Sequence, residues 1–261
     1  MAKCAVKNSF RRKDSDKIIL RGKGGPSKDQ IKNGAQFALT RHNISEFGGR
    51  SKAGKEIRHA LADLGRLADH NISASLNTVL IKIQLADPVN GRGERIIEFS
   101  KHASLLQGFS FNRKYPFDTV IRIPVQCTID KGSLSAKFII PELLPGINLF
   151  IPNKCPLFQI KVTLGAVPDC VYLKEYKVYD LPDTTKSIIN NRVSMETEWF
   201  VSSIGCKMQE IEVKLPEPIK TSVYTLVAGI GIQYGTLGAG AVIELVPDAG
   251  SAKVISTLGV Y

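Results

Sequence analysis

Residues 222–235 read SVYTLVAGIGIQYG, and this stretch decides the fold class. Within it, Val227–Ile232 is almost continuously apolar and holds two glycines. Such a run is typical of a central strand that is buried on both faces and paired on both sides. Further strand-like segments follow one another from residue 109 onward: Phe109–Phe111, Thr119–Ile129, Leu134–Ile140, Leu157–Gly165, Cys170–Tyr179, Glu196–Ile204, Glu210–Leu215, Ala241–Val246 and Ala252–Val260.

Turn signals separate these segments at short intervals, among them Asp130–Gly132, Pro145–Gly146 and Asp248–Gly250. Many short strands with such spacing predict an antiparallel β-sandwich over 91–261. The alternation of strands and helices that a parallel sheet requires is absent, which excludes a doubly wound α/β fold.

The segment 27–90 has helical character instead. Ser27–Gln30 forms a capping box, which predicts a helix to about Ser45 that ends at Gly48-Gly49. A second helix is expected from Arg50 or Ser51, and a third from about Ser73 to Ala86, because apolar residues recur at helical spacing. Helices first and strands afterwards make the expected fold class α+β.

Positive charge is concentrated at the start of the chain. The 261 residues carry a formal net charge of +11, and residues 1–60 hold 15 Lys/Arg against 5 Asp/Glu. Residues 1–26 read as a basic extended arm, in which KIILR (17–21) is strand-like. A strand needs a sheet edge to satisfy its backbone groups, so we expect this one to pair with a sheet.

A basic arm of this kind attracts anions, and three kinds of partner stay open: nucleic acid, an anionic membrane surface, or an acidic patch on a protein, including another copy of the chain. A solvated tail without a specific partner is the fourth reading. The expected anion or nucleic-acid contacts are basic residues of the arm and of the helical segment: Arg11, Arg12, Lys13, Arg21, Lys23, Lys52, Lys55 and Arg58.

The sequence holds no pattern that points to catalysis. It has no HExxH, no CxxC and no GxSxG, and its five cysteines are widely spaced. We therefore expect no enzyme activity, no catalytic or metal-binding residues, no cofactor and no small-molecule substrate. Without an apolar export signal or an apolar run of about 18 residues, the expectation is a cytoplasmic protein with no membrane span and free thiols.

The segments DQIKNGAQFALTRHNISEFGGRSKAGKEIRHAL (29–61) and LLQGFSFN (105–112) resemble an uncharacterised family of Bacteroidota proteins. Its members share the pattern IKN…TR.N..EFG…KAGK in a helical segment, followed by a β-rich half. The resemblance implies a bacterial, non-exported protein and supplies no activity and no catalytic residues.

These observations favour a structural protein that self-assembles through its arm into a homo-oligomer or polymer such as a shell, tube or filament; a capsid or tail subunit of viral origin belongs to the same class. Ile18, Ile19 and Leu20 are the expected assembly residues. The alternative is a nucleic-acid-binding or packaging protein that uses the basic segment without sequence preference. Strand alternation in ETEWFVSSI (196–204) predicts that Trp199 lies in the core and Phe200 on the outer face, where it contacts another subunit.

Overall fold

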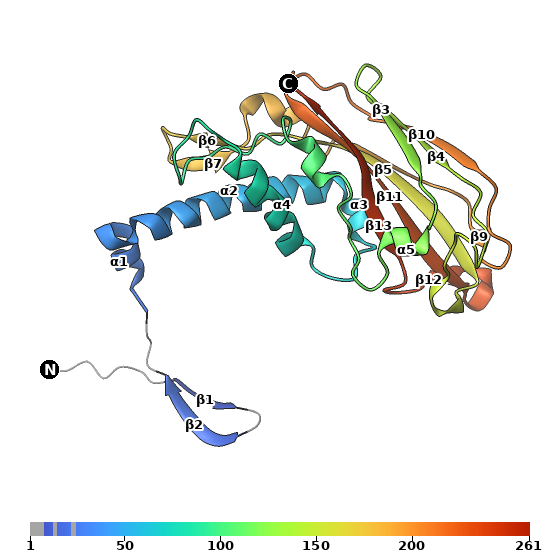
Figure 1. Ribbon diagram of the computed structural model, residues 1–261, viewed down its shortest axis with the longest axis horizontal. Coiled ribbons are helices and arrows are strands. Elements are labelled where there is room, and N and C mark those ends of the chain that lie inside the picture. The colour runs from blue at the N-terminus through green and yellow to red at the C-terminus, as the bar shows by residue number, and fades with distance from the viewer. Residues whose placement is uncertain (1–7, 13–14, 22–24) are drawn as a thin grey trace. The chain divides into compact units, whose positions relative to one another are not determined.

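The computed structural model describes residues 8–12, 15–21 and 25–261, and it has the predicted α+β architecture (Figure 1). The chain divides into two compact units, Met1–Ile44 and Ser45–Tyr261. In the described residues, no helix is both long enough and apolar enough to cross a membrane.

The first unit holds a hairpin and the start of the helical segment. Strands β1 (Asn8–Arg12) and β2 (Ser15–Arg21) pair antiparallel. The capping box is confirmed, because Ser27 Oγ accepts from the Gln30 amide and Gln30 Oε1 accepts from the Ser27 amide. The predicted single helix to Ser45 is split into α1 (Lys28–Asn33), the 3-10 turn η1 (Ala35–Phe37) and the start of α2 (Ala38–Ala60), because Gly34 adopts an extended conformation.

The prediction that Gly48-Gly49 ends a helix is wrong, because α2 continues through both glycines. Gly49 is buried, and a Cβ there would lie 2.5 Å from Cδ1 of Tyr179. The missing side chain lets the Tyr179 ring pack directly against the helix backbone. Gly48 is exposed, and a Cβ there would meet nothing within 4 Å.

The two adjacent glycines should therefore respond oppositely to alanine. Gly49→Ala is expected to destabilise the protein by about 1–2 kcal/mol, because the added methyl displaces the Tyr179 ring. Gly48→Ala is expected to stabilise it by about 0.5–1 kcal/mol, because alanine loses less backbone entropy in a helix. Urea denaturation measures whether each variant gains or loses free energy of unfolding. Equal effects of the two variants would contradict the packing of Tyr179 on α2.

The helix predicted from Ser73 is confirmed as α4 (Ser73–Leu85), and the remaining helical elements are short. They are α3 (Ala62–Gly65), α5 (Phe117–Val120) and the 3-10 turns η2 (Ala103–Leu106), η3 (Pro152–Lys154), η4 (Asp183–Ser187) and η5 (Ala239–Ala241).

The larger sheet is built around two long strands, β5 (Leu157–Val167) and β11 (Tyr224–Leu237), which pair antiparallel along their lengths. On the other side of β11 lie β13 (Ser251–Val260) and β12 (Ile243–Leu245), and on the other side of β5 lie β8 (Arg192–Glu196) and β9 (Phe200–Val201). The buried central strand predicted at Val227–Ile232 is thus confirmed.

The smaller sheet has the order β10 (Gln209–Lys214), β4 (Ser135–Ile140), β3 (Gln126–Asp130) and is antiparallel as well. Apolar side chains of both sheets form one core, in which Phe138 and Ile140 of β4 pack with residues such as Phe158 and Tyr234. The two sheets therefore make the predicted antiparallel sandwich, which Figure 1 shows on the right.

The opposite face of the larger sheet is covered by helices. A second core joins α2, α3 and α4 to Val167, Val227 and Val254 of the sheet. The approach is close, because a Cβ on Gly165 of β5 would lie 2.5 Å from the carbonyl oxygen of Ala60. The second unit therefore has three layers: helices, the larger sheet and the smaller sheet (Figure 1).

Several predicted strands are shorter than expected. Within Glu196–Ile204 the new strand is only Phe200–Val201, and Ala241–Val246 keeps Ile243–Leu245. Phe109–Phe111 forms only a bridge, between Ser110 and Lys253. Of Thr119–Ile129, the residues up to Val120 belong to α5 and the strand starts at Gln126. Pro116 precedes the helix, and Pro124 has no amide to donate to a ladder. The segment Cys170–Tyr179 folds into the hairpin β6 (Val171–Leu173) and β7 (Val178–Asp180).

Candidate assembly interface and anion contacts

The predicted assembly residues Ile18, Ile19 and Leu20 lie in β2, whose backbone pairs with β1 of the same arm. In the register, Ile19 lies opposite Phe10 and Ile18 opposite Arg11. A hairpin of two strands has two open edges and no second layer, so it is at best marginally stable by itself. The prediction that this strand pairs with a sheet is therefore met inside the arm, with one edge of β2 left over among the described residues.

The sandwich of the second unit has an open seam where an edge of each sheet comes close to the other. β13 pairs with β11 on one side, and on its other side residues 252–254 bond to the segment 108–111. β3 is an edge strand of the smaller sheet. A pocket of about 520 Å³ lies beside β13, lined also by α5 and by the segment that leads into β3. We call this pocket and the adjoining edge of β3 the seam.

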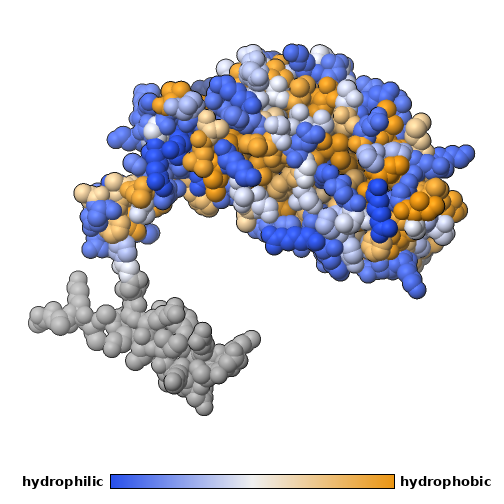
Figure 2. Space-filling view, viewed as in Figure 1, coloured by the Kyte–Doolittle hydropathy of each residue, from blue (hydrophilic) through white to orange (hydrophobic). Residues whose placement is uncertain are grey.

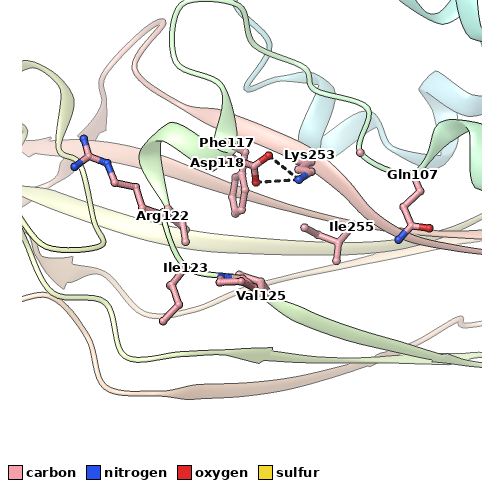
Figure 3. A pocket seen from close by; sticks show the side chains of 11 residues that line it. Gln107, Phe117, Asp118, Arg122, Ile123, Val125, Lys253 and Ile255 are labelled. Carbon is pink, nitrogen blue, oxygen red and sulfur yellow. Dashed lines mark hydrogen bonds and ion pairs between the residues drawn. The ribbon is translucent and has the colours of Figure 1, made fainter.

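Apolar side chains line the floor of the seam. Ile123 and Val125 come from the segment that leads into β3, and Ile255 comes from β13 (Figure 3). All three are half-buried and pack against the core between the sheets. β3 begins directly after Val125, and within the described residues it pairs with β4 alone, so its other edge is unpaired.

An ion pair closes one side of the seam. Lys253 Nζ lies 2.9 and 2.7 Å from the two carboxylate oxygens of Asp118, as the dashed lines in Figure 3 show. The side chain of Asp118 is 70% exposed, so this pair adds little to stability. Breaking this ion pair costs little free energy, whereas the apolar floor is fixed by the core on which it packs.

Apolar surface is also visible at other places on the sandwich, interrupted by polar side chains (Figure 2). The exposed apolar residues include Ile147, Ile204, Met208 and Leu237, each more than 60% exposed. None of these four residues lines the pocket of the seam.

The predicted anion contacts fall in both units of the chain. Arg11 and Arg12 lie in β1 and Arg21 ends β2, whereas Lys13 and Lys23 lie outside the described residues. The three remaining residues lie in the part of α2 that belongs to the second unit. They are Lys52, Lys55 and Arg58.

Those three residues have different surroundings. Lys52 Nζ donates to the Tyr179 carbonyl oxygen at 2.9 Å and pairs with Asp180 at 2.8 Å, so it is engaged inside the protein. This contact lowers the pKa of Asp180. Lys55 is exposed, and Arg58 lines a second pocket together with Arg50. Sequence reasoning counted Arg50 as basic but missed that its spacing from Arg58 places both on one helix face.

The face assignment at Trp199 and Phe200 is wrong. Phe200 packs against the core between the sheets, with its ring centroid 5.4 Å from that of Phe158. Trp199 is half-buried and lies over Gly235 of β11 instead. The strand is interrupted at 197–199, so alternation does not carry across it. A role of Phe200 in subunit contact therefore needs a partner that reaches a half-buried ring.

The described cysteines Cys127, Cys155, Cys170 and Cys206 are free. Burial raises the pKa of the Cys127 and Cys170 thiols to about 12, so both thiols are protonated at neutral pH. Among the described residues, no three His, Cys, Asp or Glu side chains gather as a metal site would require.

No family model matches the chain, and neither a curated protein nor a solved structure matches it. Its function is therefore argued from the geometry of the described residues.

Proposed function

We propose that this chain is a non-enzymatic structural protein that assembles with copies of itself, the arm of one copy docking in the seam of the next. The seam is the observation that carries the proposal. It offers an apolar floor, and β3, which has an unpaired edge among the described residues, follows directly along the chain from Val125. A strand that docks there gains main-chain hydrogen bonds from the edge and buries its apolar residues on the floor.

The arm has the complementary properties. β2 contains three consecutive apolar residues, Ile18, Ile19 and Leu20, in a hairpin that is too small to hold a core. Its unpaired edge can continue a sheet of another copy, as exposed edges do. A docked arm would pair with the free edge of β3 as an added strand, and it would cover the apolar floor of the seam. Head-to-tail docking of this kind produces a ring, tube or filament, depending on the rotation between copies.

Deletion of residues 1–26 tests the role of the arm. We expect the full-length chain to sediment as an oligomer at micromolar concentration and the deletion to sediment as a folded monomer. The double substitution of Ile18 and Ile19 by Asp should act like the deletion, because it removes apolar contacts and leaves the length unchanged. If full-length and truncated chains are both monomers, the assembly proposal is wrong.

A peptide of residues 15–24, added to the deletion protein, tests the seam directly. It should bind in fluorescence polarisation, and Val125→Arg should weaken this binding at least tenfold, because the new charge lies on the apolar floor. Val201→Arg is the matched control: it makes the same change at an exposed valine of β9, outside the seam, and should leave binding unchanged. If Val125→Arg has no effect while deletion still dissolves the oligomer, the arm docks elsewhere.

Binding of nucleic acid by the arm is the competing outcome. If a labelled oligonucleotide binds to the full-length chain but not to the deletion, and its affinity falls steeply with salt, the function of the arm is to bind nucleic acid instead. Sedimentation in the absence of nucleic acid separates the two functions, because self-assembly needs no added ligand.

A further inference from the structure

A second pocket lies in the helical layer, away from the seam, and its lining is cationic. It has a volume of about 560 Å³, within the usual range of small-molecule sites. One wall is a face of α2, and the other is the loop before α4 and the first turns of α4. Its lining contains two arginines and no aspartate or glutamate. We call it the α2–α4 pocket.

The positions on α2 explain why the two arginines meet here. Arg50, Gly54 and Arg58 follow one another at intervals of four residues, so they share a helix face. Gly54 lies between them and leaves the centre of that wall open, since its missing Cβ would be 3.5 Å from Nη1 of Arg58. Across the pocket lie Asn71 and Asn77, whose carboxamides can both donate and accept hydrogen bonds.

Positive charge in and beside the pocket exceeds negative charge. Arg50 lies 3.9 Å from Glu46, and Arg95 lies 3.7 Å from the same carboxylate. One negative charge is therefore shared by two positively charged guanidinium groups. Arg58 forms no hydrogen bond or ion pair with any described residue. An anion in the pocket would supply the missing negative charge, and a guanidinium binds a phosphate group through two parallel hydrogen bonds.

Arg50 is held in place with Nε and Nη1 already engaged, which leaves Nη2 for an anion. Its side chain is 12% exposed, Nε donates to Asn77 Oδ1 at 2.9 Å, and Nη1 donates to Gln84. Burial lowers the pKa of Arg50, whereas the negative charge of Glu46 opposes this shift. A buried guanidinium with fixed orientation loses little entropy when it binds a ligand.

Phe47 adds a flat apolar surface at the same pocket. Its ring lies 5.9 Å from the guanidinium carbon of Arg50, and the residue is 56% exposed. An exposed aromatic beside arginines can stack on a planar ring of a ligand. The first turn of α4 also faces the pocket through Ser73 and Ala74, and its backbone amides favour negative charge.

We propose that the α2–α4 pocket binds a small phosphate monoester with a planar ring, of the size of a nucleoside monophosphate, with Arg50 and Arg58 on the phosphate and Phe47 against the ring. This binding is independent of the arm and of the seam. It revises the expectation that the chain has no small-molecule ligand.

Isothermal titration calorimetry of the full chain with adenosine 5′-monophosphate tests the proposal. We expect saturable binding with one site, at least tenfold weaker binding of inorganic phosphate, and no binding of adenosine. Arg58→Gln should weaken binding at least tenfold, and Arg58→Lys less. The matched control is Lys55→Gln, which removes a charge from the same helix outside the pocket and should leave affinity within twofold.

Gly54→Leu is a second variant that keeps both arginines. A Cβ there makes ordinary contacts, 3.4 Å from Cδ1 of Leu80, so the fold should tolerate it while the side chain fills the pocket. It should abolish binding without lowering the thermal midpoint by more than a few degrees. Circular dichroism of each variant establishes that it is folded.

Three results would overturn the proposal. The first is the absence of binding at millimolar monophosphate, and the second is an equal effect of Arg58→Gln and Lys55→Gln. The third is binding of inorganic phosphate as tight as that of the monophosphate, which would remove the role of Phe47. If a single-stranded oligonucleotide binds in an Arg58-dependent way while the monophosphate does not, the pocket is part of a nucleic-acid interface instead.

Discussion

Replacing Phe158 by alanine should cost about 3–5 kcal/mol of the free energy of unfolding. Phe158 is fully buried in the core between the two sheets, and its ring contacts that of Phe200. It also lies opposite Tyr234, near one end of the ladder between β5 and β11, the two central strands of the larger sheet. The cavity cannot close easily there, because it is surrounded by strands of both sheets. Guanidinium denaturation measures the loss.

Phe200 supplies the control for this prediction. Because the two rings touch, Phe200→Ala should be destabilising, and the double variant should cost less than the sum of the two single variants. Phe158→Leu should cost clearly less than Phe158→Ala, since leucine refills part of the space. A loss below 1 kcal/mol for Phe158→Ala, or strict additivity with Phe200→Ala, would contradict this packing.

The fold class could be predicted because apolar patterns in strands depend on local sequence. Val227–Ile232 is apolar at every position that is not glycine, and only a strand covered on both faces uses such a run. The helix at Ser73 and the capping box at Ser27 are likewise local patterns, and both are confirmed. These features need no knowledge of which distant residue packs where.

The errors arose where a distant residue decides the local structure. Gly48-Gly49 looks like a helix end, but Gly49 is small because Tyr179, 130 residues later, packs on it. Strict alternation placed Trp199 in the core, but the strand is interrupted before Phe200 and the alternation restarts. Sequence patterns carry no signal for the contact of Tyr179 with Gly49 or for the interruption of the strand before Phe200.

The candidate sites were predictable in part. The basic arm and its apolar strand are visible in the sequence, whereas the seam depends on two sheet edges that lie far apart along the chain. In the α2–α4 pocket, the spacing of Arg50 and Arg58 by eight residues is a signal that points to one helix face. The structure adds Asn71 and Asn77 from another element, and it shows that Lys52 is engaged with Asp180.

Asp87 should dominate the stability of the loop that follows α4. Its carboxylate accepts four hydrogen bonds: from the amides of Val89, Asn90 and Ile96 and from the side chain of Asn90, at 2.8–3.1 Å. Replacement by alanine leaves three backbone amides without this acceptor. Since hydrogen bonds to a charged group contribute about 1.5–3 kcal/mol each, we expect a loss of about 3 kcal/mol or more.

The same contacts predict how stability depends on pH. Burial raises the pKa of Asp87, but the hydrogen bonds outweigh it, so the pKa lies below its usual value. The folded state therefore favours the carboxylate, and the stabilisation is present above the pKa of the unfolded chain, about 3.9. It is lost as the pH falls from there through the lower folded pKa.

Asp87→Asn removes this titration while keeping the shape of the side chain. It should lower stability at pH 7 and flatten the fall in stability below about pH 4. Asp183→Asn, the same change at an exposed carboxylate, is the control for the loss of one negative charge. Urea denaturation from pH 2.5 to 7 measures both curves. If Asp87→Asn runs parallel to the wild type below pH 4, Asp87 does not hold the loop as a carboxylate, and the four hydrogen bonds do not account for its stability.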